Sequence, residues 1–354
     1  MNALEHELEY PFGDTLPGPA ERLQVAPGVF WVRMPLPFAL NHIKLYLVRD
    51  RLAGEECWTL IDCGVATDEI RGLWETIFSA TTEGLERLPI RRILCTHGHP
   101  DHIGLASWIG AKFNAMLWIT HGEISVCRHL SAGVGESAEH VVEFFRSNGI
   151  DDQGVLDGIG ARQGKYFPTL VPDVPMAFHR LRVDEPVYMG GRKFQVILGT
   201  GHSPEHAALY NEPDGILFSG DMVLPRISTN VSVWNSEPES DPVTWYLNSL
   251  KEYEACRADT LVLPSHGRPF RKLHRRLEQL NEHHAERLGV VLEACKQKTY
   301  SAAEIVPVLF NRSFDLHQTT FALGEALAHL HALWYEGKLK RTVGAAGVVR
   351  FAAA

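Results

Sequence analysis

The chain has 354 residues, of which 45% are hydrophobic and 22% charged, and its formal net charge is −9. This composition excludes a disordered, collagen-like or coiled-coil protein, and the length favours two domains. The negative charge argues against non-specific nucleic-acid binding, which depends on basic surface. The 18 histidines are numerous, whereas the 6 cysteines form no CxxC pair. The cysteine pattern therefore indicates a reduced protein rather than a disulfide scaffold.

The N-terminal ten residues are acidic and lack the basic and then apolar segments of a signal peptide. No uninterrupted apolar stretch approaches the length that is needed to cross a bilayer. We therefore expect a cytoplasmic protein that has no membrane partner.

Short strands alternate with helices over the first 120 residues. Strands are predicted where brief β-branched or aromatic runs end at a turn. They are expected over residues 29–34, 43–48, 58–62, 92–95 and 115–119, with helices over 68–80 and from 103 to 109. This alternation indicates a layered α/β architecture.

Residues 121–185 interrupt that alternation. Helices are predicted over 138–146 and 151–162, and a Pro-rich link over 166–175. Long excursions from a scaffold often cover a binding site, so this helical insertion is interpreted as a lid or substrate-binding region, with an ordinary surface elaboration as the alternative.

Strand patterns resume after the insertion, over residues 193–198, 207–210, 216–219 and 260–263. A long helix is predicted over 272–295, because its leucines recur at helical spacing. Helices over 301–310 and 319–336 and two short strands over 339–343 and 348–351 follow. Helices followed by a small hairpin are typical of a winged-helix module.

The most specific feature is a histidine cluster directly after the strand at 92–95. It reads Thr96-His97-Gly98-His99-Pro100-Asp101-His102. Imidazole nitrogens and carboxylate oxygens are preferred ligands of zinc and similar divalent ions. His97 and His99 point the same way along an extended segment and can chelate one ion. Asp101 and His102, where the chain turns into a helix, can reach a second ion.

Three single residues extend this cluster. His202, Asp221 and His266 each follow an apolar strand and stand beside Gly or Pro. In a layered α/β fold the strand ends converge on one rim, where binding sites are built. The shared context therefore predicts that these three side chains join the histidine cluster as metal ligands.

Together these residues resemble the metallo-β-lactamase superfamily of binuclear metal hydrolases over about residues 25–270. The resemblance implies an αββα sandwich with the metals at one edge. It implies one metal held by His97, His99 and His202 and another held by Asp101, His102 and His266. Asp221 would bridge both ions, and the catalytic carboxylates would be Asp101 and Asp221.

Two further positions match the superfamily. Asp62, at the end of an early strand, would brace the metal-binding loop from behind its ligands. His206, four residues after His202, matches a frequent family histidine that is not a ligand. Cys63 stands where Thr or Ala is more usual and is interpreted as a small buried residue.

The resemblance also predicts a domain organisation. Residues 1–270 would form the catalytic domain, 271–298 a connecting helix and 299–354 a module that resembles the winged helix of a subgroup of these hydrolases. That module has five Lys/Arg against four Asp/Glu. Its near-neutral charge favours packing or homodimer formation over DNA binding.

Two divalent ions a few ångströms apart lower the pKa of a bridging water, and the resulting hydroxide can attack a carbonyl. A thiolate leaves without a strong general acid, and no further Asp, Glu or His has a spacing that marks it as one. The pattern therefore favours thioesters or activated esters such as lactones. Zinc is the expected metal, with iron and manganese as alternatives.

Similarity to glyoxalase II and related acyl-thioester hydrolases makes a small molecule, acyl-glutathione or acyl-CoA, the first choice of substrate. One alternative is a metal-dependent endoribonuclease, against which the net acidity counts, and another is a lactonase. A non-catalytic binding protein would have lost ligands, whereas all seven are present. Residues 225–242, which contain Trp234, are expected to line the pocket. Arg226 and Arg268 would contact a substrate carboxylate or phosphate, or are ordinary surface arginines.

Overall fold

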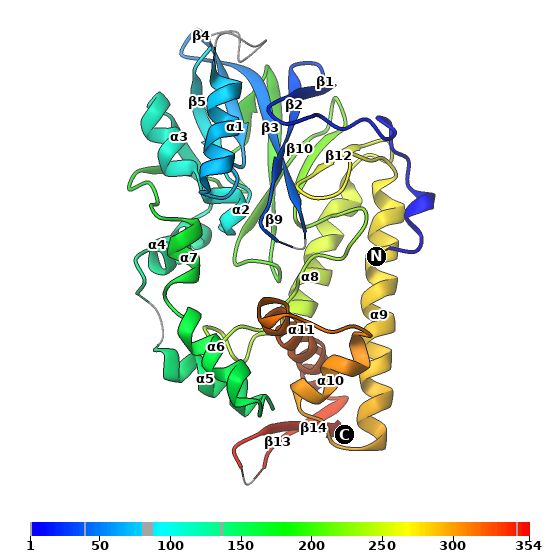
Figure 1. Cartoon of the computed structure of the whole chain (residues 1–354). Coiled ribbons are helices and arrows are strands. Elements are labelled where there is room, and N and C mark those ends of the chain that lie inside the picture. Colours follow the sequence, from blue (N-terminus) through cyan, green and yellow to red (C-terminus); the bar gives the residue numbers. More distant parts are fainter. Residues whose placement is uncertain (1, 39, 80–87, 135–136, 345) are drawn as a thin grey trace.

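Two β-sheets lie face to face in the computed structural model, and helices cover the outer face of each sheet (Figure 1). The structure describes residues 2–38, 40–79, 88–134, 137–344 and 346–354. The predicted αββα sandwich is therefore confirmed, with a helical module at the C-terminal end. None of the described helices is long and apolar enough to cross a membrane.

The first sheet has seven strands in chain order, antiparallel from β1 to β4 and parallel from β4 to β7. Its strands are β1 (Arg22–Ala26), β2 (Val29–Pro35), β3 (His42–Leu52), β4 (Glu55–Ile61), β5 (Ile90–Leu94), β6 (Met116–Ile119) and β7 (Phe178–Arg180). Helices α1 (Asp68–Phe78), α2 (Pro100–Ile103) and α3 (Ala106–Phe113) connect the parallel strands. Parallel neighbours need such crossovers, and these cover the outer face of the sheet. The predicted end of the first helix, Ala80, lies outside the described residues.

The second sheet has the order β12-β11-β10-β9-β8. Its strands are β8 (Val187–Met189), β9 (Arg192–Gly199), β10 (His206–Asn211), β11 (Ile216–Gly220) and β12 (Leu261–Pro264). Helix α8 (Pro242–Lys251), the short turn η2 (Glu252–Ala255) and helix α9 (Leu273–Gln297) pack on its outer side. The short turn η1 (Glu5–Glu7) precedes the first strand.

Large aromatic side chains fill the space between the two sheets. Trp31 and Tyr46 of the first sheet and Phe194 and Phe218 of the second are almost fully buried there. The rings of Tyr46 and Phe218 meet edge to face with centroids 5.3 Å apart. The Tyr46 hydroxyl donates to the carbonyl of Pro264 at 2.8 Å, so the buried polar group is satisfied across the two sheets.

The insertion forms α4 (His121–Ser131), α5 (Ala138–Ser147), α6 (Gln153–Arg162) and α7 (Tyr166–Leu170). The interpretation of residues 166–175 as a link is wrong for its first half, which is α7. The insertion also contributes β7, which pairs in parallel with β6 at the edge of the first sheet. The insertion is therefore partly integrated into the sandwich.

The C-terminal part contains α10 (Ala302–Leu309), α11 (Leu316–Tyr335) and the hairpin β13 (Leu339–Val343) and β14 (Val349–Ala353). Both helices begin with a capping box. In each, the side chain of the N-cap residue accepts a hydrogen bond from the backbone N–H three residues later, and the side chain of that later residue accepts one from the N-cap backbone N–H. The helices pack on α9 and share a hydrophobic core with the second sheet. This module is thus continuous with the sandwich.

Candidate metal centre

The histidine cluster forms the loop between β5 and α2, at the carboxyl end of a parallel strand. Pro100 stands at the first position of α2, where its missing N–H costs nothing. Gly98 is required by a close approach, because a Cβ there would lie 2.3 Å from the Sγ of Cys127. The backbone of the loop therefore packs closely against α4 at Gly98.

The second sheet supplies the other three side chains from the ends of its strands. His202 follows β9, Asp221 follows β11 and His266 follows β12. Gly220, at the end of β11, has φ +51°, a left-handed conformation that favours glycine. The structure thus brings all seven predicted residues to one rim of the sandwich.

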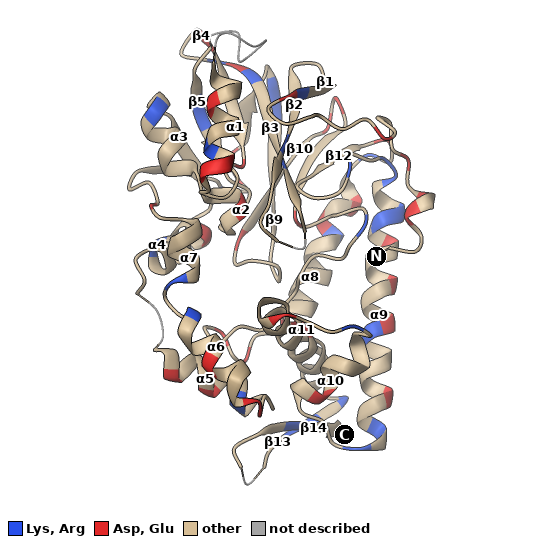
Figure 2. Cartoon of the chain, viewed as in Figure 1, with Lys and Arg blue, Asp and Glu red and all other residues tan. Residues whose placement is uncertain are grey.

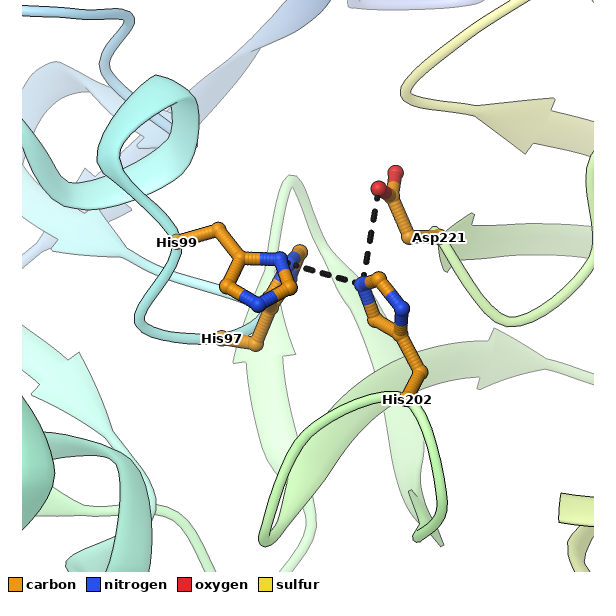
Figure 3. A group of neighbouring side chains, drawn as sticks. All are labelled: His97, His99, His202 and Asp221. Carbon is orange, nitrogen blue, oxygen red and sulfur yellow. Dashed lines mark hydrogen bonds and ion pairs between the residues drawn. The ribbon is translucent and has the colours of Figure 1, made fainter. Parts of the chain in front are cut away.

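A first donor group combines His97, His99, His202 and Asp221, whose donor atoms all lie within 4.8 Å of one another. Figure 3 shows the three imidazoles and the carboxylate pointing toward a common centre. The Nε2 atom of His97 lies 2.9 Å from Nδ1 of His99 and 3.2 Å from Nε2 of His202. The Nε2 atom of His202 lies 3.6 Å from Oδ2 of Asp221.

A second donor group, Asp101, His102 and His266, lies beside the first. The Oδ2 atom of Asp101 lies 3.7 Å from Nε2 of His102 and 3.3 Å from Nε2 of His266. Asp221 also faces this group, with Oδ1 3.7 Å from His102 and Oδ2 3.5 Å from His266. Its carboxylate therefore stands between the two groups.

The chemistry of these donors fits divalent metal ions. Among the described residues, Nε2 of His102 and Oδ1 of Asp221 are buried without a hydrogen-bond partner, which is costly unless another group satisfies them. Burial, together with the neighbouring imidazoles, holds the pKa of His97 well below its usual range. Burial likewise lowers the pKa of His99 to about 3, so both rings are neutral and offer lone pairs.

In three of the predicted imidazole ligands, Nδ1 makes a hydrogen bond outside the donor groups. These bonds direct the other ring nitrogen, Nε2, into the centre. His102 donates from Nδ1 to Asp62 at 2.8 Å, and His202 donates to the carbonyl of Asn230 at 2.8 Å. His266 donates to the carbonyl of His42 at 2.9 Å. Such partners fix the tautomer and orientation of metal-binding imidazoles. Asp62 therefore contacts one predicted ligand, His102, and the neighbouring Thr96 of the same loop, in the way that the superfamily resemblance implies.

Glu123 of α4 also supports the loop, although no sequence motif marked it. It is 2% exposed and accepts hydrogen bonds from the backbone N–H groups of Gly98 and Glu205, each at 2.8 Å. It thereby joins the loop that carries the histidine cluster to the loop that carries His202. A signal for this role was absent because the partners meet only in the folded chain.

Arg226 and Arg268, expected to contact substrate or to lie on the surface, both pair with the N-terminal segment. The guanidinium of Arg226 lies 3.1 Å from Glu5. Arg268 pairs with Asp14 and stacks over the ring of Tyr10. The N-terminal acids thus balance these two charges, and the surface interpretation fits the structure better.

Partly exposed aromatic rings from four separate segments contact one another in a single cluster. The ring of His317 in α11 lies 5.9 Å from Phe38, 5.3 Å from Tyr166 and 4.8 Å from Phe321. Phe321 in turn contacts Trp234 at 5.2 Å. We call these five residues the aromatic cluster. It joins the β2–β3 loop, the insertion, the 225–242 segment and the C-terminal module.

Comparison with known proteins gives matches over both the sandwich and the C-terminal part of the chain. The family model for the metallo-beta-lactamase superfamily matches residues 43–266, and that for the metallo-beta-lactamase-like C-terminal domain matches residues 288–354. The crystal structure of a beta-lactamase domain protein from Burkholderia ambifaria is 50% identical, covers 100% of both chains and gives a TM-score of 0.93.

Two more distant relatives also align along most of their length. A metallo-beta-lactamase family protein from Thermus thermophilus is 28% identical, covers 94% of this chain and 100% of its own, and gives a TM-score of 0.75. The probable metallo-hydrolase YqjP of Bacillus subtilis is 23% identical over 330 residues, which are 86% of this chain and 92% of that protein. The chain therefore belongs to the metallo-beta-lactamase superfamily.

Proposed function

We propose that this metallo-hydrolase uses two divalent ions to cleave a thioester, or an activated ester such as a lactone. The observation that carries the proposal is the pair of adjacent donor groups with the carboxylate of Asp221 between them. One group alone would suffice for a single ion. The orphaned atoms on His102 and Asp221 lie where the two groups meet, which supports a second ion.

In the proposed assignment each ion has three residues of its own and shares the seventh. One ion would be held by His97, His99 and His202, and the other by Asp101, His102 and His266. Asp221, whose carboxylate faces both groups, would be the shared residue. Zinc is our first choice because nitrogen and carboxylate donors suit it, and the same donors accept iron and manganese.

Bound divalent ions would lower the pKa of a water molecule and polarise the substrate carbonyl. The chain provides carboxylates that stay ionised beside that water. Burial raises the pKa of Asp101, but His102 and His266 outweigh it and hold this pKa at about 2. In the reaction, water adds to the carbonyl carbon and the C–S bond breaks, giving a carboxylic acid and a thiol. The thiolate leaves without needing a general acid.

The aromatic cluster supports a substrate with an apolar part. Tyr166 lies near enough to Asp101 for that carboxylate to contribute to raising the pKa of its phenol to about 12, although burial is the larger cause. Trp234 follows Asn230, which orients His202. The rings of this cluster would offer an apolar surface to an acyl chain.

The charges along α9 weaken the endoribonuclease alternative. Figure 2 shows Asp and Glu interspersed with Lys and Arg along this helix. Arg275, for example, pairs with Glu7, Glu278 and Glu282. A phosphodiester backbone is attracted by unbalanced positive charge, which such pairing removes.

We also propose that residues 1–270 form the catalytic domain, 271–298 the connecting helix and 299–354 a winged-helix-like module. The proposal is supported by the position of α9, which runs beside the second sheet and then packs against α10 and α11 (Figure 1). The module's role in this arrangement is structural support of the site and contribution of His317 and Phe321 to the aromatic cluster.

Metal analysis and one variant test the proposal. Purified protein should hold close to two metal ions per chain, and Asp221→Asn should lose at least one ion and most of its activity. Asp157→Asn, at an exposed position on α6, is the matched control and should change neither. A single tightly held ion together with undiminished turnover in Asp221→Asn would contradict it. A panel of acyl-CoA, acyl-glutathione, lactone and RNA substrates under one metal condition then identifies the substrate class.

A further inference from the structure

The hydrophobic core between the two sheets has one end that faces the candidate metal centre. At this end, two basic side chains follow the core residues. Along β2 and β3, side chains alternate between the two faces of the sheet. Trp31 and Tyr46, which lie opposite each other, face the second sheet. Arg33 and Lys44, the next opposed pair on that face, continue the row toward the rim. Two basic residues thus continue a row whose two preceding opposed pairs, Val29 with Val48 and Trp31 with Tyr46, belong to the hydrophobic core.

Lys44 is buried without an acidic partner. Its side chain is about 1% exposed, and Nζ lies 3.4 Å from Nε2 of His42 and 5.3 Å from the ring centre of Trp31. Within the described parts of the chain, no carboxylate lies within 4 Å of Lys44 or Arg33. Burying an ammonium without a counter-ion is costly, so this arrangement is expected where a ligand supplies the negative charge.

The same stretch of β3 is tied to the metal-binding residues. The backbone N–H of Lys44 donates to the carbonyl of Ser265 at 2.7 Å. The carbonyl of His42 accepts the hydrogen bond from His266 at 2.9 Å. Burial, reinforced by the charge of Arg33, holds the pKa of Lys44 well below its usual range, whereas the nearby carboxylate of Asp221 acts in the opposite direction. An anion held here would lie beside the reacting bond.

We propose that Arg33 and Lys44 form an anion-binding subsite that holds a carboxylate or phosphate group of the substrate next to the metal centre. The inference rests on the proposed function, because it assigns this group to the molecule that the centre hydrolyses. Arg226 and Arg268 lie nearby but are balanced by Glu5 and Asp14, so they are not part of the subsite.

Three matched thioesters distinguish a substrate carboxylate from a substrate phosphate as the group that the subsite holds. The N-acetylcysteamine thioester of butyrate is neutral, that of succinate has a carboxylate on the acyl side, and butyryl-CoA has phosphates on the leaving side. We expect the wild-type protein to prefer one charged substrate over the neutral one by at least tenfold in kcat/KM. In Arg33→Gln this preference should fall at least tenfold, mainly through KM. Arg51→Gln, an exposed arginine at the opposite end of β3, should keep it.

Lys44→Met provides a readout that does not depend on turnover. It removes the buried charge and keeps the stem, so its melting temperature should rise while its affinity for inorganic phosphate, measured by calorimetry on the metal-loaded protein, falls at least tenfold. A structural lysine would instead give a lower melting temperature and unchanged phosphate affinity, which would overturn the proposal. So would equal losses on all three thioesters in Arg33→Gln.

Failure of the proposed function gives a different result. If metal-loaded protein cleaves no thioester, the proposed thioesterase activity is wrong. The phosphate titrations of wild type, Arg33→Gln and Lys44→Met still decide whether the subsite exists. Phosphate binding that both variants retain at wild-type strength would show that the metals alone hold the anion, and would contradict the subsite.

Discussion

The ring nitrogen Nε2 of His206 accepts a hydrogen bond from the backbone N–H of Asp221 at 3.1 Å. Burial and the nearby imidazole of His202 hold the pKa of His206 well below its usual range, so its ring is neutral and can accept this bond. A Cβ on Gly220 would lie 2.3 Å from the same nitrogen. His206 therefore positions the shared carboxylate without itself being one of the proposed ligands.

Replacing His206 should weaken metal binding. We expect His206→Leu to lose about 10- to 100-fold in metal affinity, because supporting partners of metal ligands typically contribute that much. Competition with a fluorescent chelator measures the affinity. His206→Gln, whose amide oxygen can accept the same hydrogen bond, should recover part of the loss, and the exposed His140→Gln should lose nothing. Equal affinities for all four proteins would contradict the positioning role.

The C-terminal helix α11 supports the loop that orients His202. The carbonyl of Asn230 holds the imidazole of His202, and three residues later the N–H of Val233 donates to the carbonyl of Gly324 at 3.1 Å. A Cβ on Gly324 would lie 2.8 Å from Cβ of Ser232. Position 324 therefore requires glycine because of this close approach between helix and loop.

Gly324→Ala should accordingly lower kcat/KM by about tenfold, because the added methyl displaces the loop and with it His202. The same change improves helix propensity by about 1 kcal/mol, so activity and stability respond to different causes. Gly289→Ala on α9 is the control, since a Cβ there meets nothing within 4 Å. That control should raise the melting temperature and leave activity unchanged. Full activity in Gly324→Ala would show that the loop tolerates the methyl.

The candidate metal-binding cluster could be predicted from the sequence because its signal is local. Four donors occur within six residues after one apolar strand, and the other three repeat the same strand-end context. The alternation of strands and helices predicted only a layered α/β architecture, and the αββα order of the layers followed from the superfamily resemblance. In contrast, Glu123 acts through partners that are distant in the sequence and has no local signal.

Some elements were missed for different physical reasons. Helix α8 has a start signal in the sequence, with Asp241 as N-cap and Pro242 at the first position, but no strong apolar periodicity follows it. Strand β7 has only three residues and owes its pairing to β6, which no periodicity reveals. Strand β1 is a short edge strand with a weak burial pattern. Short edge elements depend on tertiary contacts more than on local sequence.

A buried histidine pair joins α9 to α11 and predicts a loss of stability in acid. Nδ1 of His284 lies 3.3 Å from Nε2 of His329, and both side chains are at most 1% exposed. Burial, reinforced by the facing His283 and Arg287, lowers the pKa of His329 to about 4 and that of His284 well below its usual range. The fold therefore favours the neutral rings.

Because the pKa values are lower in the folded than in the unfolded chain, the unfolded chain binds more protons, and stability falls as the pH drops from about 6.5 toward 4. His284→Phe retains a ring beside Tyr246 and His329 but cannot titrate. Its free energy of unfolding should depend less steeply on pH between 6.5 and 5 than that of the wild type. Urea titrations of both proteins across this pH range measure the difference in their free energies of unfolding. The contribution of the metal centre cancels in this difference because both proteins contain it. Parallel pH profiles would rule out the pair as a source of acid sensitivity.

A buried ion pair at the edge of the sandwich away from the metal residues should contribute strongly to stability. Nη2 of Arg92 lies 2.5 Å from Oδ2 of Asp50, with both side chains under 5% exposed. Arg92 also donates to the carbonyl of Tyr188, and Asp50 accepts from the N–H of Gly190, so the pair joins β3 and β5 to the second sheet. Removing either partner leaves an uncompensated buried charge.

Arg92→Met should therefore lower the free energy of unfolding by about 3 kcal/mol or more, as is typical when one member of a buried pair is removed. Arg146→Met is the comparison, because Arg146 pairs with Glu143 where the two side chains are 45% and 63% exposed, and exposed pairs contribute about 1 kcal/mol or less. Urea denaturation of the metal-loaded proteins measures both losses. Metal content and kcat/KM of folded Arg92→Met should match the wild type, since Arg92 contacts none of the proposed ligands. Similar small losses in the two variants would mean that water reaches the Arg92–Asp50 pair and screens it as it does on the surface.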